Sequence, residues 1–383
     1  ASAAGVFFIA LTLLSGDIKG FSYSYLVAFI FWYTLSWGAL VFLLIHHLTG
    51  SVWSIVIRRL WENIAGTIPI WALFFIPILI LNSFIYPWTD PDVVSHSPLL
   101  VKKSSYLNMP FFAIRGIIYW IILIFITIRM RKLPLTQDLT PHSVGRRDFV
   151  KIAAPGTILY AVVVTFAAFD WVMSVEPEWY STIYGVYLAM GGCVASLAAM
   201  IGVIEFLRKR KVFHGILGEA ESIHQPITVE HYHDLGKLLF TFIILWAYMV
   251  FSQYFLIWYA NIPEETAFYR HRWVGSWRWV SLMIVFGHFV LPFFVLISQP
   301  AKRNRVVLLS VSLGILFFHY VDLYWNVLPV LDKEGLKFRW SDLGTMLLLG
   351  GMFCLRQSRF VARSPLIPIG DPQLLASVKH RQH

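Results

Sequence analysis

Residues 22–48 read SYSYLVAFIFWYTLSWGALVFLLIHHL, an apolar run that contains no Asp, Glu, Lys or Arg. A helix rises about 1.5 Å per residue, so this run can cross a hydrocarbon core of about 30 Å. Similar runs recur along the chain, and 58% of its 383 residues are hydrophobic while only 14% are charged. A water-soluble domain could not bury so much apolar surface. The sequence therefore predicts an all-α integral membrane protein.

Ten stretches are predicted to form membrane helices, at residues 4–14, 22–48, 64–86, 109–130, 149–174, 180–207, 234–260, 274–299, 305–329 and 342–357. The first is too short to cross a bilayer, and we interpret it as the end of a truncated helix. A cleaved signal peptide is the alternative, although no basic n-region or cleavage site is visible. The last stretch is marginal in length. Together they predict one polytopic domain, 1–357, followed by an extended basic tail, 358–383.

Basic residues follow a pattern that predicts the orientation of the chain. Most of the 31 Lys and Arg residues lie after the second, fourth, sixth and eighth spans or in the tail. Positively charged connections stay in the cytoplasm, so both termini and the 208–233 connection are expected inside and the 87–108 connection outside. The net charge of +10 is therefore explained by the orientation of the chain in the membrane. A nucleic-acid partner is excluded, because no basic cluster lies on a soluble domain.

Ionisable side chains at membrane depth are costly and are therefore candidates for function. In the outer third of the membrane the spans carry Asp170, His319 and Asp322, and His288 lies near the midplane. His319 and Asp322 are three residues apart and share a helix face, which predicts a hydrogen-bonded pair that titrates near neutral pH. These four residues are predicted to belong to a proton relay with His288 between two half-channels. His288 could equally form an interhelical hydrogen bond.

Four further relay candidates lie near the inner third of the membrane: Glu205, His233, Asp234 and Lys237. Asp234 and Lys237 have the spacing of an ion pair and could neutralise each other. Charged residues at span ends more often extend to the lipid headgroups than conduct protons. This alternative stays open for all four residues.

No cofactor or metal is predicted to be bound by this chain. Cys193 and Cys354 lie in apolar stretches without the spacing of a metal or iron–sulfur site. A haem between His288 and His319 is the alternative, but the two are expected to differ in depth by a turn or more. The His-Tyr-His run before Asp234 lacks a third ligand.

Two long motifs carry a resemblance to a known family. HDLGKLLFTFIILWAYMVFSQYFLIWYANIPEET, at 233–266, and FDWVMSVEPEWYSTIYGVYLAMGG, at 169–192, resemble signatures of a membrane subunit of bacterial alternative complex III, in the NrfD/PsrC-like family of quinol-linked proteins. The resemblance covers nearly the whole chain. It implies two four-helix bundles, at about 22–174 and 180–329, flanked by the first and last helices, and a place in the bacterial inner membrane. Asp170 matches the family's outer-facing carboxylate.

The resemblance also implies partners. Members of this complex oxidise a quinol, and the electron carriers, haem c and iron–sulfur clusters, lie in iron–sulfur and multihaem cytochrome c subunits. The quinol site is expected in a sister NrfD-like subunit, ActC, and other small membrane subunits and lipids complete the assembly. Three functions therefore compete: a proton-translocating subunit of a quinol:electron acceptor oxidoreductase, a quinol-binding subunit in its own right, and a structural anchor for the outer-face redox subunits. The intramembrane carboxylates favour the first.

Overall fold

The computed structural model describes all residues except 1, 15, 141–142, 214–225 and 381–383. The described residues form helices joined by short connections, with no strand among them. Eight helical segments within them are long and apolar enough to cross a membrane. The predicted all-α class is confirmed at this level. The count of ten spans and the NrfD/PsrC-like pair of bundles stay predictions.

The eight segments are Ile18–Thr49 (α2), Ile55–Ile80, Met109–Leu139 (α9), Arg146–Val175, Tyr184–Lys209 (α11), Val229–Ala260 (α12), Trp277–Leu296 and Arg305–Val330. Four of them are composite, and the seventh comprises α14 (Trp277–Ile284), η3 (Val285–Val290) and α15 (Leu291–Leu296). The second comprises α3 (Ile55–Ala65), α4 (Ile68–Phe74) and α5 (Ile76–Ile80); the fourth contains α10 (Arg146–Trp171) and the eighth contains α17 (Arg305–Val327). Pro69 and Pro77 stand in the first turns of α4 and α5, and because proline lacks an N–H the segment is divided there.

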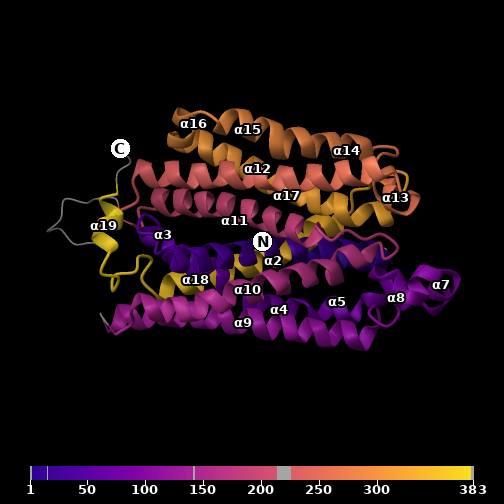
Figure 1. Ribbon diagram of the computed structural model, residues 1–383, viewed down its shortest axis with the longest axis horizontal. Coiled ribbons are helices and arrows are strands. Elements are labelled where there is room, and N and C mark those ends of the chain that lie inside the picture. The colour runs from indigo at the N-terminus through magenta and orange to yellow at the C-terminus, as the bar shows by residue number, and fades with distance from the viewer. Residues whose placement is uncertain (1, 15, 141–142, 214–225, 381–383) are drawn as a thin grey trace.

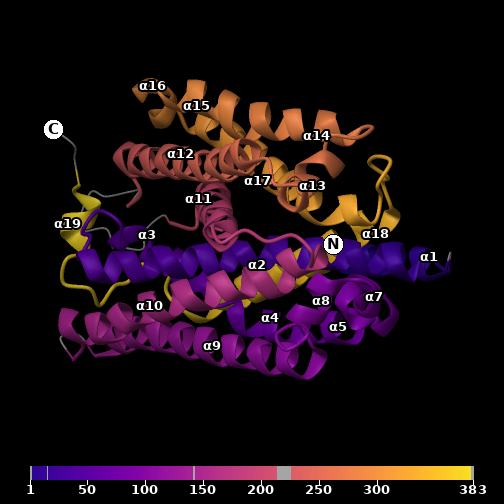
Figure 2. The ribbon, with the colours of Figure 1, turned by 45° about the vertical axis from the view of Figure 1, so that its right-hand side comes forward.

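The helices gather into two groups, which the two views of the ribbon separate clearly (Figures 1 and 2). The first helix group contains α2, α3–α5, α9 and α10, and the second contains α11, α12, α17 and the segment Trp277–Leu296. The long helices α2 and α11 pack against each other and join the two groups. Both are buried along most of their length, which explains why their apolar residues face all directions.

Two helices outside these eight segments lie beside α2. α1 (Ser2–Leu14) is short, and α18 (Trp340–Arg363) begins earlier and ends later than predicted. They pack closely against each other: a side-chain carbon on Gly5 would lie 2.6 Å from the backbone nitrogen of Leu348. Small residues allow such close helix contacts in membranes.

Short helices lie at the two ends of the molecule (Figure 1). One end carries α7 (Pro91–His96), α8 (Pro98–Lys103) and α13 (Pro263–His271), and we call it the α13 end. The other, the α19 end, carries α16 (Gln299–Arg303) and α19 (Leu374–Val378). The short helices α6 (Asn82–Ile85) and η1 (Pro87–Thr89) connect α5 to α7.

The tail is more ordered than the sequence predicted. Residues up to Arg363 continue α18, and α19 forms a further helical turn. Ser377 links the tail to both helix groups: its hydroxyl donates to the carbonyl of Trp53 at 2.9 Å, and its own carbonyl lies 3.1 Å from Nε2 of His231. A segment expected to be extended therefore fastens the first helix group to the second.

Candidate functional site

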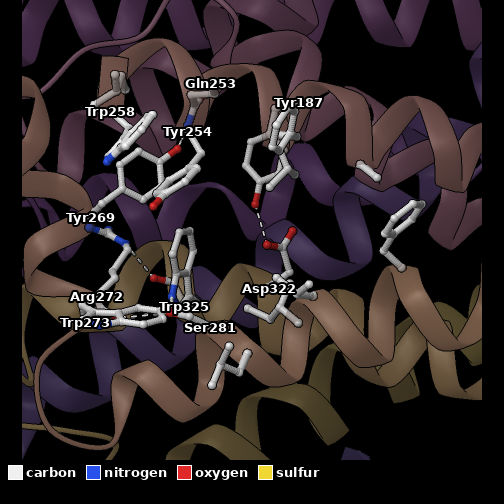
Figure 3. Close-up of a pocket in the computed structure, with 18 of the residues that line it drawn as sticks. Tyr187, Gln253, Tyr254, Trp258, Tyr269, Arg272, Trp273, Ser281, Asp322 and Trp325 are labelled. Carbon is white, nitrogen blue, oxygen red and sulfur yellow. Dashed lines mark hydrogen bonds between the residues drawn. The ribbon is translucent and has the colours of Figure 1, made fainter. Parts of the chain in front are cut away.

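A carboxylate at membrane depth forms the centre of the site, inside the second helix group. Oδ1 of Asp322, on α17, accepts a 2.5 Å hydrogen bond from the hydroxyl of Tyr187 on α11 (Figure 3). The Asn326 amide donates to that same hydroxyl at 2.6 Å and to the Asp322 carbonyl at 2.8 Å. The indole N–H of Trp246 lies near the carboxylate without completing a hydrogen bond. Asp322 is 3% exposed, so its carboxylate is surrounded by protein groups and depends on them for its hydrogen bonds.

His319 lies one turn before Asp322, but the predicted hydrogen bond between them does not form. Nε2 of His319 lies 3.0 Å from Oγ1 of Thr34 on α2, and Nδ1 has no hydrogen-bond partner among the described residues. Thr34 donates its own hydroxyl to the carbonyl of Phe31 at 3.0 Å. If Thr34 donates its proton to Phe31, it accepts from His319, and this geometry favours an imidazole proton on Nε2 with Nδ1 as the acceptor.

Gly191 keeps open the space in front of this acceptor. A side-chain carbon at this position would lie 3.2 Å from Cε1 and 3.4 Å from Nδ1 of His319, and 3.6 Å from Cδ1 of Trp246. The free nitrogen therefore faces the same space as the indole beside Asp322. Nothing in the sequence around Gly191 indicated this role for a glycine in an apolar helix.

His288 completes the cluster from the third helix of the group. It lies in η3 (Val285–Val290), a π-helical turn that precedes Pro292. Proline cannot donate the N–H that would bond to the His288 carbonyl, which favours this irregular turn. The imidazole is fully buried, and neither ring nitrogen has a partner among the described residues.

The His288 ring packs 4.1 Å from Trp246 and 6.3 Å from His319, centroid to centroid. The rings of the two histidines are therefore near neighbours. That the two residues differ in depth by a turn or more stays a prediction. Buried polar groups without partners commonly bind ordered water. The arrangement can hold a proton at Asp322, at Nδ1 of His319 or on His288.

Asp170 lies in the other helix group and is tightly paired. Arg115 donates to its two oxygens at 2.8 and 2.9 Å, and the Tyr119 hydroxyl donates at 2.8 Å. A third donor of Arg115 bonds to the carbonyl of Tyr106 at 2.9 Å. Burial, and then the Asp170 charge, raise the pKa of Tyr106 to about 12. This charge-assisted network has the geometry of a structural ion pair.

The four candidates near the α19 end do not join the cluster. Glu205 pairs with Arg208 at 2.8 Å, and Asp234 pairs with Lys237 at 2.7 Å, as its spacing predicted. Asp234 also lies 3.0 Å from Nε2 of His380 in the tail. His233 lies 4.0 Å from Glu230. The structure thus separates the eight predicted residues into a central cluster, one buried ion pair and a set at the α19 end.

Sequence reasoning missed a buried charge network on α3. Arg58 pairs with Glu62 at 3.1 Å and with Asp371 at 2.6 Å, and Arg59 contacts both Glu62 and Asp138. Arg58, Arg59 and Glu62 are at most 2% exposed. From the sequence, the two arginines contributed only to the predicted orientation of the chain in the membrane. The Arg58–Glu62 spacing of four within an apolar stretch was the available sign.

A cavity of about 1110 Å³ reaches the site from the surface of the second helix group. Asp322 and Tyr187 line its deep part, and Gln253, Tyr254 and Trp258 on α12 line the part nearer the α13 end (Figure 3). Asp322 and Tyr187 are therefore accessible through a space between α12 and the segment Trp277–Leu296.

No metal centre is evident in the part of the chain that the structure describes, since no three His, Cys, Asp or Glu side chains there gather closely enough to hold an ion. Cys193 is buried and Cys354 is exposed, and both are free. That this chain binds no cofactor stays a prediction.

Comparison with known proteins gives no further identification: no family model matches the chain, and no curated protein matches it. The long apolar helices are compatible with a multi-pass membrane protein.

Proposed function

We propose that this chain is a proton-translocating membrane subunit of a quinol-oxidising electron-transfer complex. The observation that carries the proposal is the cluster of Asp322, Tyr187, His319 and His288 at membrane depth. Buried ionisable residues of this kind mark proton pathways in membrane proteins. The quinol-oxidising complex itself rests on the motifs at 169–192 and 233–266, with haem c and iron–sulfur clusters in partner subunits and quinol as the substrate of the complex.

The geometry supports a specific order of proton carriers. Asp322 can hold a proton at its carboxylate, and the Tyr187 hydroxyl stabilises the ionised form by donating to Oδ1. His319 offers the free acceptor Nδ1, while Thr34 keeps the other nitrogen protonated. His288 lies beyond His319 and can exchange protons through a bridging water. A proton can thus pass between helices α17 and η3.

Asp170 has a different place in this proposal. Arg115 and Tyr119 occupy its oxygens, and releasing the carboxylate would leave a buried guanidinium unpaired. We therefore assign it to stabilising the first helix group. Glu205, His233, Asp234 and Lys237 would serve as the exchange region at the predicted cytoplasmic side.

The test is proton movement per electron in vesicles that contain the reconstituted complex. An Asp322→Asn variant should oxidise quinol while moving fewer protons. If proton stoichiometry and quinol turnover both stay intact, the relay is wrong and a structural anchor is favoured. If quinol turnover is abolished in a fully assembled complex, a quinol site in this chain is favoured instead.

A further inference from the structure

The cavity beside Asp322 is long, largely apolar and open along one side of the protein. Along α12 and its C-cap residue, the lining extends from Ile244 to Asn261, which is about 25 Å at 1.5 Å per residue. That length approaches the thickness of the hydrocarbon core. Its volume of about 1110 Å³ is at the upper limit for small-molecule pockets. A compact polar ligand would leave most of this space empty.

The open side of the cavity faces the membrane. Tyr248, Phe251 and Trp258, on α12, line it and are each about three-fifths exposed, at 61%, 62% and 61%. Val285, on the opposite wall, is 48% exposed. Exposed apolar and aromatic side chains along a membrane-spanning segment contact lipid. An occupant can therefore enter from the bilayer without crossing the protein.

The end of the cavity near α13 is polar and positively charged. Arg270, in the last turn of α13, lines this end and is exposed, and Trp258 and Trp273 stand beside the opening. Tryptophans of this kind mark the lipid headgroup level. Arg272 is less available, because it is buried and already donates to Glu176 and to the carbonyls of Trp325 and Asn326.

We propose that this cavity binds one glycerophospholipid from the leaflet at the α13 end, with its phosphate at Arg270 and one acyl chain along α12. The charge at the opening matches a phosphate, and the apolar groove beyond matches a hydrocarbon chain. An acyl chain in the outer part of the groove would close the lateral opening toward Asp322. Protons would then reach the carboxylate along the helix group and not from the bilayer. The observations that support the lipid site do not depend on the proposed proton transport.

The test uses the full chain in the assembly with which it is purified, exchanged into a detergent that removes loosely bound lipid. Native mass spectrometry and lipid extraction then count the retained phospholipid, after incubation with phosphatidylglycerol vesicles. Two variants remove the site: Ala247→Trp fills the groove, and Arg270→Gln removes the charge. We expect one retained phospholipid in the wild type and a loss of about tenfold or more in each variant.

Matched variants control for general effects on folding. Ala161→Trp adds the same bulk to an exposed position on α10, and Arg278→Gln removes an exposed arginine outside the cavity lining. Both should retain the lipid. The proposal is overturned if the wild type retains none, if a quinol occupies the site in its place, or if Ala247→Trp retains as much phospholipid as Ala161→Trp. Neither result bears on whether Asp322→Asn alters proton movement.

Discussion

The Tyr187 hydroxyl, on α11, donates a 2.5 Å hydrogen bond to Oδ1 of Asp322 on α17. The two residues are 135 positions apart in the sequence. Their contact gives the carboxylate a strong hydrogen-bond donor at a depth where the bilayer would otherwise disfavour its negative charge. Exchanging Asp322 for Asn keeps the size and most hydrogen bonds but removes the titrating group.

In the Asp322→Asn variant we expect quinol oxidation to persist and proton transfer through this chain to slow by about a hundredfold or more, as is typical when a positioned acid or base is removed. The measurement is the number of protons moved per electron in reconstituted vesicles. Asp148→Asn is the control, because Asp148 forms an exposed pair with Lys151, lies outside the proposed relay and should change the ratio little. An unchanged ratio in Asp322→Asn would contradict the relay.

Asp170→Asn should act on stability more than on proton movement. It removes the charge that balances the buried Arg115, and breaking a buried pair costs about 3–5 kcal/mol. Thermal unfolding in detergent should show a clear loss. Asp148→Asn, in an exposed pair with Lys151, is expected to leave the unfolding temperature almost unchanged. Equal effects of the two changes would argue against the structural role of Asp170.

Thr34 is predicted to set the tautomer of His319. Thr34→Val keeps the shape but removes the acceptor, whereas Thr34→Ser keeps it. Losing one neutral hydrogen bond of about 0.5–1.5 kcal/mol should slow proton transfer about two- to tenfold in the valine variant only. Nitrogen NMR of labelled histidine should find the Nε2-protonated form in the wild type and in the serine variant. A His319 spectrum unchanged by valine would disprove the assignment.

Orientation can be tested with single cysteines in a background where Cys193 and Cys354 are replaced by serine. Ser95→Cys, in the exposed helix α7, should react with impermeant reagents from outside, and Lys209→Cys should react from the cytoplasmic side. The reason is the bias of positive charge toward the predicted inner connections. Reversed labelling would invert the direction of the proposed relay.

The purified chain is expected to contain no haem, metal or iron–sulfur cluster. Its cysteines are single, and among the described residues no three metal-binding side chains gather. Visible absorption and metal analysis provide the measurement. A stoichiometric haem band would contradict this prediction and would favour haem ligation by His288 and His319 over the relay.

The sequence predicted the helical class and most of the long helices, because runs of apolar residues determine both in a membrane. Hydropathy could not detect where Pro69 and Pro77 divide a helix into shorter pieces. The residues of the candidate site were predicted only from their expected depth in the membrane. His319 and Asp322 share a face of α17 as expected, but Thr34 and Tyr187 bind them from other helices. Such partners depend on how helices pack, which spacing within one helix does not reveal.

The attachment of Ser377 to Trp53 and His231 has a consequence for biosynthesis. Residues 374–380 leave the ribosome after every helix of both groups has been made. The hydrogen bonds of Ser377 to the two helix groups can therefore form only after both groups have been synthesised. Synthesis of α19, and not insertion of any single span, is therefore the step that supplies these contacts.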